Sequence, residues 1–233
     1  MKRPVFLTSG VLTGLFCGAM ILLSWGAFYL QLKTDRERTV RNAFLQTDNL
    51  ARTFEEHSLR TVENVRQVLF SLKEIYEKRG GGVVQTFEEA ANASVARYAI
   101  RSREAQGNLF NLLSIADENG DLVLSSQVPF NPVNIVARPF FRAHRDGEKG
   151  FLVGAPILGT ATGKWYIPMS LPIEKPDGSF GGVVLASVNP FYFSGFYRQV
   201  SLGARGTVLL VGAGGTILAG TVEGGETPFG ASI

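Results

Sequence analysis

Residues 134–189 read NIVARPFFRAHRDGEKGFLVGAPILGTATGKWYIPMSLPIEKPDGSFGGVVLASVN, and this stretch decides the fold. It contains three apolar runs, at residues 151–158, 165–173 and 181–188, with turn residues between them. Each run has the length and composition of a β-strand. The sequence therefore predicts three consecutive antiparallel strands. Ahead of them, Arg138-Pro139-Phe140-Phe141 places a cation beside two rings in a short turn stiffened by proline.

A predicted β-hairpin precedes this stretch. Apolar runs at residues 109–116 and 122–126 flank the segment Asp117-Glu118-Asn119-Gly120-Asp121. Asn-Gly between two such runs is a strong hairpin signal, because both residues tolerate positive φ. The acidic residues also resemble the start of a calcium loop, but the glycine comes too early and no glutamate follows at the twelfth position. We therefore expect a hairpin turn here.

The N-terminal region contains a predicted membrane anchor. No charged residue occurs in residues 4–32, a run longer than the about 20 residues that span a bilayer. The run lacks the small-residue cleavage site of a signal peptide, and aromatic residues near its end suit the membrane interface. A buried core helix is the alternative. We expect residues 1–33 to form a short cytoplasmic tail and an uncleaved transmembrane anchor.

Residues 34–80 are predicted to form a long scaffold helix. Apolar and small residues recur at spacings of three and four between Val40 and Tyr76, which indicates one face of a helix. The glycine run 80–82 ends it. Such a helix needs a partner, so it packs along the domain that follows or forms a homodimer through its N-terminal half. His57 is expected on its surface.

The C-terminal part resembles the predicted hairpin. Residues 209–219 align with residues 114–124, each as strand, tight turn and strand. Residues 208–215 also resemble a dinucleotide-binding turn, but that fingerprint needs a glycine where Ile217 stands, followed by a helix. We therefore expect a second module of the same kind to begin here, and the natural protein to continue beyond Ile233.

The predicted elements together give an α+β fold. It consists of a transmembrane helix, a long scaffold helix, an antiparallel sheet of five strands, and the start of a second similar module. Shorter helices are expected at residues 86–105 and 191–200.

The chain resembles Cache domains, which are PAS-like sensor modules that bacterial membrane receptors hold outside the cytoplasm. The resemblance covers residues 35–233 and is carried by RPFF (138–141), GAP (154–156), TGKW (162–165), DGSFGGVV (177–184) and VNP (188–190). It implies a double Cache arrangement, with a membrane-distal module at residues 81–200 and the beginning of a membrane-proximal module at residues 201–233. It also implies that a ligand binds between the sheet and the segments that follow its second strand.

The resemblance further implies a set of ligand-binding residues. Arg138 corresponds to the arginine of the family's Arg-Pro-(Tyr/Phe)-Phe motif, and a guanidinium grips a carboxylate with two parallel hydrogen bonds. Phe140 and Phe141 are candidate pocket walls, and His144 is a candidate pH-dependent donor. The alternatives are a structural ion pair for Arg138 and ordinary core packing for the aromatic residues. The candidate ligand-binding residues are Arg138, Phe140, Phe141, His144, Trp165, Tyr166, Ser170 and Asn189.

Departures from the family pattern bear on the ligand. Family members that bind amino acids carry a Trp-Tyr step and a nearby aspartate where this chain has Phe140-Phe141 and Ala143. Many relatives also carry basic residues where this chain has Thr160 and Leu171-Pro172. The expected ligand is therefore a small, partly apolar monocarboxylate rather than an α-amino acid or a highly charged di-acid. An empty pocket with a structural role is the alternative.

The expected function is a sensor anchored in the cell (inner) membrane, with residues from about 34 onward outside the cytoplasm. It would relay ligand binding to an output domain outside this chain, such as a diguanylate cyclase or a histidine kinase. The charges conflict with this orientation, because four basic residues at 33–41 follow the span and two precede it. We expect the orientation that the resemblance implies, since the positive-inside rule weakens when a long domain is translocated.

Other functions find little support in the sequence. The two histidines lie far apart, and the common hydrolase, metalloprotease and phosphate-loop motifs do not occur, so we expect no enzyme activity, no cofactor and no metal. The net charge of +3 is mild and forms no basic patch, so nucleic acid is not an expected partner. The single cysteine, Cys17, excludes a disulfide within one chain. The rival functions are a membrane-anchored binding protein without output and a cytoplasmic nucleotide-binding enzyme.

Overall fold

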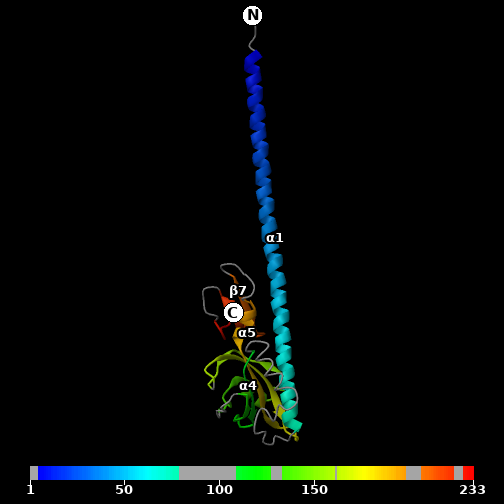
Figure 1. The fold of residues 1–233 in the computed structure, drawn as a ribbon, viewed down its shortest axis with the longest axis vertical. Helices are drawn as coiled ribbons and strands as arrows, with labels where there is room; N and C mark the ends of the chain where they lie inside the picture. The colour runs from blue at the N-terminus through cyan, green and yellow to red at the C-terminus, as the bar shows by residue number, and fades with distance from the viewer. Residues whose placement is uncertain (1–4, 79–108, 127–132, 161, 198–205, 223–227) are drawn as a thin grey trace. The chain divides into compact units, whose positions relative to one another are not determined.

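The computed structural model describes residues 5–78, 109–126, 133–160, 162–197, 206–222 and 228–233. Helix α1 (Val5–Lys78) contains both the predicted anchor and the predicted scaffold helix, without a break between them (Figure 1). The chain divides into two compact units, Met1–Glu56 and His57–Ile233. The predicted helix at residues 86–105 lies outside the described residues.

The first unit holds a candidate membrane span. Over the described residues, α1 is the one helix long and apolar enough to cross a membrane, with a mean hydropathy of 1.7 in its most apolar window. None of that window is buried within the protein, and side chains such as Leu15, Phe16 and Leu22 are exposed. A helix that is apolar all round needs an apolar environment. These observations favour the predicted anchor.

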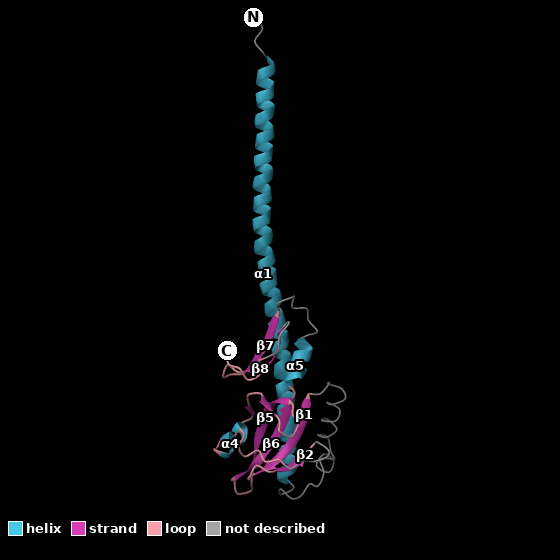
Figure 2. Cartoon of the chain, turned by 90° about the vertical axis from the view of Figure 1, so that its left-hand side faces the viewer, coloured by secondary structure: helices cyan, strands magenta, loops and turns pink. Residues whose placement is uncertain are grey.

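The second unit contains an antiparallel sheet in the spatial order β2-β1-β6-β5-β3, with β4 also paired to β5 (Figure 2). This confirms the predicted α+β class. The central strand is β6, which pairs with β1 on one side and with β5 on the other. The strands are β1 (Phe110–Asp117), β2 (Leu122–Ser125), β3 (Leu152–Val153), β4 (Ile157–Leu158), β5 (Trp165–Glu174) and β6 (Phe180–Val188).

The predicted strand at residues 151–158 is two short strands in the structure. Both β3 and β4 pair with β5, but at separate places along it. Gly154-Ala155-Pro156 lies between them, and Pro156 has no N–H to donate to a sheet ladder. The prediction of one continuous strand was therefore wrong at this proline.

The segment after Arg138 is a helix rather than the predicted turn. Helix α4 (Pro139–Arg145) begins directly after Arg138, whose φ of −73° and ψ of 139° are extended. Proline excludes the preceding residue from the helical region, and proline itself fits the first position of a helix. Helix α5 (Pro190–Tyr197) also starts at a proline, one residue before the region predicted to be helical.

The sheet separates two layers of side chains. On one face, Val183 and Leu185 of β6 form a buried cluster with Phe140 and Phe141 of α4. Because alternate strand residues point to opposite faces, the residues between them face the other layer, where residues 57–78 of α1 lie (Figure 2). The buried residues of this part of α1 follow helical spacing and are Ser58, Thr61, Val65, Val68, Leu69 and Leu72.

A second hairpin repeats the pairing of the first. Strand β7 (Thr207–Val211) pairs with β8 (Ile217–Val222), as β1 pairs with β2. Leu210 pairs with Ala219, and Ile115 pairs with Leu124 at the equivalent place. In both hairpins the register shifts immediately after this pair. The similarity predicted from the sequence is therefore present in the backbone pairing.

The two turns are also built alike. Each has a glycine with positive φ, Gly120 at 85° and Gly215 at 78°. A residue later in the chain then pairs with each hairpin through an isolated antiparallel bridge, Asn134 with Asp121 and Ser232 with Thr216. In the first turn the Asp117 carboxylate accepts backbone N–H groups at 3.0 and 2.9 Å. This carboxylate closes the turn, as the hairpin interpretation of the acidic segment predicts.

We predict that Gly182→Ala destabilises the sheet strongly. Gly182 has a φ of 130°, and an added Cβ would lie 2.0 Å from the Ala116 carbonyl oxygen of the neighbouring strand. Backbone strain and the clash together should cost roughly 3 kcal/mol or more. Urea unfolding of the full chain in detergent, followed by tryptophan fluorescence, measures this loss.

The matched control is Gly195→Ala in α5. A Cβ at Gly195 meets nothing within 4 Å, so this variant should be as stable as the wild type or up to about 1 kcal/mol more stable. Equal unfolding midpoints for Gly182→Ala and the wild type would contradict the tight approach of β6 to β1.

Candidate functional site

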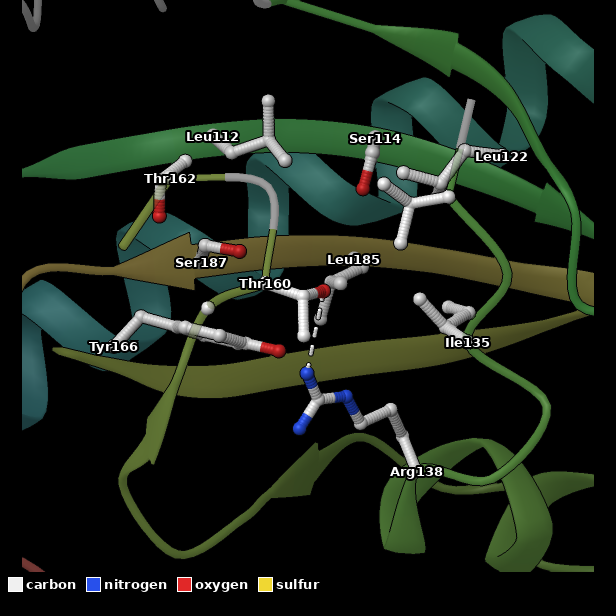
Figure 3. A pocket seen from close by; sticks show the side chains of 12 residues that line it. Leu112, Ser114, Leu122, Ile135, Arg138, Thr160, Thr162, Tyr166, Leu185 and Ser187 are labelled. Carbon is white, nitrogen blue, oxygen red and sulfur yellow. Dashed lines mark hydrogen bonds between the residues drawn. The ribbon is translucent and has the colours of Figure 1, made fainter. Parts of the chain in front are cut away.

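A small cavity with a mixed polar and apolar lining lies on the face of the sheet that α4 covers (Figure 3). Its volume is about 30 Å³. Cationic, hydroxyl and apolar side chains meet in it. The lining residues are Leu112, Ser114, Leu122, Val133, Ile135, Arg138, Gly159, Thr160, Thr162, Tyr166, Leu185 and Ser187.

Arg138 supplies the positive charge of this cavity. Its backbone is held on both sides, because its N–H donates to Ile135 O at 2.9 Å and its carbonyl accepts from Arg142 N at 3.1 Å. The half-buried guanidinium makes one long contact, from Nη2 to Thr160 Oγ1 at 3.5 Å. Within the described part of the chain, no carboxylate forms an ion pair with Arg138. Most of its donors are therefore available to a ligand.

Tyr166 of β5 adds a hydroxyl to the same cavity. Burial raises the pKa of Tyr166, and the nearby charge of Arg138 lowers it in part. The phenol therefore keeps its proton at neutral pH and can donate a hydrogen bond. Figure 3 shows its oxygen directed toward the guanidinium of Arg138 and the side chain of Thr160.

Two serines from neighbouring strands complete the polar lining. Ser114 of β1 pairs across the sheet with Leu185, and Ser187 of β6 pairs with Leu112, so hydroxyls and apolar side chains alternate. Ser114 is 1% exposed, and its Oγ has no hydrogen-bond partner among the described residues. Sequence reasoning missed both serines. A serine within a mostly apolar strand was the one sign in the sequence that could have indicated them. The sequence does not show which face of the sheet such a serine occupies.

The aromatic candidates from the sequence lie elsewhere, apart from Tyr166. Phe140 and Phe141 are buried in the cluster between α4 and the sheet, and Phe141 also meets Phe180 edge to face at 5.4 Å. Trp165 is 38% exposed and lies 5.9 Å from the ring of Phe229. None of these three lines the cavity.

Asn189 also lies outside the cavity. Its Oδ1 accepts a hydrogen bond from the Phe191 N–H at 3.0 Å, so its side chain caps the start of α5. His57, which the sequence analysis expected at the surface, is half-buried and stacks on Phe196 of α5 at 3.8 Å. Both residues therefore contribute to the packing around α5.

His144 and Ser170 form a buried pair beside the cavity. The Nδ1 of His144 lies 2.7 Å from the carbonyl oxygen of Glu148, and its Nε2 lies 2.9 Å from Ser170 Oγ. A carbonyl only accepts, so Nδ1 carries the proton and Nε2 accepts the serine hydroxyl. Burial lowers the pKa of His144, the bond and charge of Glu148 oppose this, and the charge of Lys73 adds to the lowering. The pair ties α4 to β5.

Comparisons with known proteins place this fold among receptor domains. No protein-family model and no curated protein sequence matches the chain. The extracellular domain of rpHK1S-Z16, described as a histidine kinase, is 27% identical, with a TM-score of 0.60 over 74% of this chain and 68% of that chain. The ligand-binding domain of the Campylobacter jejuni chemoreceptor Tlp3, solved with L-valine, is 18% identical, with a TM-score of 0.50 over 77% of this chain and 73% of that one.

A third structure extends the comparison. An extracellular ligand-binding receptor from Desulfohalobium retbaense is 14% identical, with a TM-score of 0.59 over 78% of this chain and 32% of that chain. The chain thus has the fold of sensor domains that bacterial receptors hold outside the cytoplasm. This confirms the expectation drawn from the resemblance to Cache domains.

We predict that the protein loses stability as the pH falls below about 6.5. The pKa of His144 in the folded protein is lowered from its ordinary value of 6.5, so the unfolded chain binds a proton more readily. The stabilisation is complete above pH 6.5, declines below it, and stops declining below the folded-state pKa. Thermal unfolding of the full chain in detergent at several pH values measures this.

The variant His144→Gln tests the assignment, with His57→Gln as its control. These are the two histidines of the chain, and burial lowers the pKa of His57 as well. We expect His144→Gln to remove the larger part of the pH dependence, because His144 is the more deeply buried of the two. If His144→Gln leaves the dependence of the thermal midpoint on pH unchanged, His144 is not held neutral in the folded protein.

Proposed function

We propose that this chain is the extracytoplasmic sensing region of a bacterial transmembrane receptor, and that it binds a small carboxylate at Arg138. The observation that carries the proposal is the guanidinium in the wall of a cavity with a mixed polar and apolar lining, without an ion pair among the described residues. A partly buried charge is costly unless it is paired. A ligand anion would supply the missing partner.

The geometry around Arg138 suits a carboxylate. A guanidinium presents parallel donors that match two carboxylate oxygens, and such charge-assisted bonds are the strong ones. The protonated hydroxyl of Tyr166 offers a further donor beside it. The aliphatic side chains of Leu112, Leu122 and Leu185 also line the cavity, and an apolar lining lowers the local dielectric and strengthens a charged contact.

The position of the cavity supports a relay to the membrane. Arg138 precedes α4, α4 packs on the sheet, and the opposite face of the sheet lies against residues 57–78 of α1. Ser58 of α1 also bonds to Tyr197 of α5 at 2.9 Å. We propose that a ligand shifts α4 and the sheet against α1, and that this shift changes the packing of α1 in a homodimer.

The remaining parts of the receptor are assigned on the same grounds. We propose the module boundaries 81–200 and 201–233, a dimer contact through the N-terminal half of the scaffold helix, and an output domain of the histidine kinase or diguanylate cyclase type outside this chain. The exposed Val40, Phe44 and Leu45 on α1 support the dimer contact. The 27% identity to a histidine kinase's extracellular domain supports the kinase output over the cyclase.

Arg138→Gln should weaken the binding of a simple carboxylate. The loss of hydrogen bonds between charged groups should reduce affinity about 10-fold to 100-fold. Calorimetric titration of the full chain in lipid nanodiscs with propionate measures this. Arg142→Gln is the matched control, because Arg142 lies on the same helix but bonds to Ala137 O at 2.7 Å and does not line the cavity. Equal affinity in the wild type and Arg138→Gln would refute the role of Arg138.

The orientation of the anchor is testable by labelling intact cells. Cys17 is the only cysteine, so Cys17→Ser gives a cysteine-free background into which Lys149→Cys is introduced. Lys149 has a side chain that is 74% exposed, and its surface ion pair contributes little to stability. We expect a membrane-impermeant maleimide to label this cysteine without lysis. Labelling only after lysis would place the sheet in the cytoplasm, as the charges beside the span indicate.

A further inference from the structure

We infer that the cavity selects short monocarboxylates that carry a neutral oxygen substituent, of the 2-hydroxy or 2-oxo acid class, over amino acids and di-acids. This inference rests on the proposed carboxylate site at Arg138. It adds a second recognition point, the hydroxyl of Ser114. It also adds a charge limit, which means that the lining residues accept one negative charge on the ligand and no further charge of either sign.

Ser114 is a buried hydroxyl without a partner. Its side chain is 1% exposed, and its Oγ makes no hydrogen bond to any described residue. Buried polar groups are nearly always hydrogen-bonded, so an orphan group needs a specific explanation. Figure 3 shows the Ser114 hydroxyl and the Arg138 guanidinium on opposite sides of the cavity, both directed into it. A ligand that satisfies both carries a carboxylate at one end and a hydrogen-bonding atom near the other.

The charges of the lining residues limit what that second atom can be. Among the described lining residues, Arg138 is the one charged group, and no aspartate or glutamate is present. The ammonium of an amino acid would be buried without an anion, and a second carboxylate would lack a second cation. Burying an unpaired charge is far more costly than burying a bonded hydroxyl or carbonyl. The polar atom opposite the carboxylate is therefore a neutral oxygen.

The size and the apolar lining limit the ligand further. The cavity holds about 30 Å³, so a long acyl chain does not fit in it. Leu112 and Leu185 alternate with the two serines on the sheet floor. A short carbon skeleton therefore lies against leucine while its oxygens meet Arg138 and Ser114.

A matched series of three-carbon acids tests the inference. Propionate, lactate, pyruvate, alanine and malonate differ mainly in the group added to one skeleton, and each is titrated calorimetrically into the full chain in lipid nanodiscs. We expect lactate or pyruvate to bind about 5-fold to 10-fold more tightly than propionate, which corresponds to one additional hydrogen bond. We expect alanine and malonate to bind more weakly than propionate.

Ser114→Ala is the deciding variant. It should reduce the affinity for lactate or pyruvate to that for propionate, while propionate binding stays unchanged. Because the hydroxyl has no hydrogen-bond partner among the described residues, its removal should leave the thermal midpoint equal or higher, which shows that the variant folds. Ser71→Ala on α1, whose hydroxyl bonds to Gln67 O at 3.0 Å away from the cavity, is the control.

The outcomes separate this inference from the proposed function. If propionate binds as tightly as lactate and pyruvate, or if Ser114→Ala affects all acids alike, the second recognition point is refuted while the carboxylate site stands. If alanine or malonate binds most tightly, the charge limit is refuted. If no acid binds the wild type, the proposed function fails and this inference fails with it.

Discussion

The burial of Phe140 and Phe141 against the sheet determines where Arg138 lies. Helix α4 has only 7 residues, too few to persist without tertiary packing. Its two phenylalanines are 4% and 0% exposed and join β6 side chains in one cluster, and burying each contributes roughly 1.5–3 kcal/mol. Arg138 stands directly before this helix, with an extended backbone that Pro139 enforces. Apolar packing of α4 therefore places the Arg138 cation at the edge of the cavity, although Phe140 and Phe141 do not line that cavity.

A second attachment holds the other end of α4. His144 accepts the Ser170 hydroxyl of β5 and donates to the Glu148 carbonyl, so α4 is joined to β5 by hydrogen bonds and to β6 by packing. A ligand that moves Arg138 acts on a helix with attachments to both strands. Those strands also carry the side chains that face residues 57–78 of α1. This continuity of packed elements is the physical basis for the relay proposed above.

The two hairpins have the same backbone pairing although their turn sequences have little in common. Their turns, Asp117-Glu118-Asn119-Gly120-Asp121 and Gly212-Ala213-Gly214-Gly215-Thr216, share only the glycine at positive φ. That conformation excludes most side chains, whereas the flanking positions need only strand propensity. The hairpins differ in their surroundings, because β1 also pairs with β6, while β7 pairs only with β8 among the described strands. The first hairpin is accordingly the more deeply buried.

Local chemistry along the chain was sufficient to predict the apolar N-terminal helix, the long helix, most of the strands and the two hairpins, because these depend on apolar run length, periodicity and turn residues. The resemblance to Cache domains named Arg138 and Tyr166 as candidates, and both line the cavity. Pairing between residues far apart in the chain decided which other side chains line the cavity. Ser114 and Ser187 share the cavity only because β1 lies beside β6 in one register, and a shift of β1 by one residue would turn the Ser114 hydroxyl to the opposite face. The same dependence on distant partners explains why Trp165 meets Phe229 and His144 meets Ser170. The sequence by itself determined most of the elements and the extended backbone of Arg138 before Pro139. Tertiary structure decided where Arg138 lies in space and which side chains share its cavity, because helix packing and strand register are set by residues far apart in the chain.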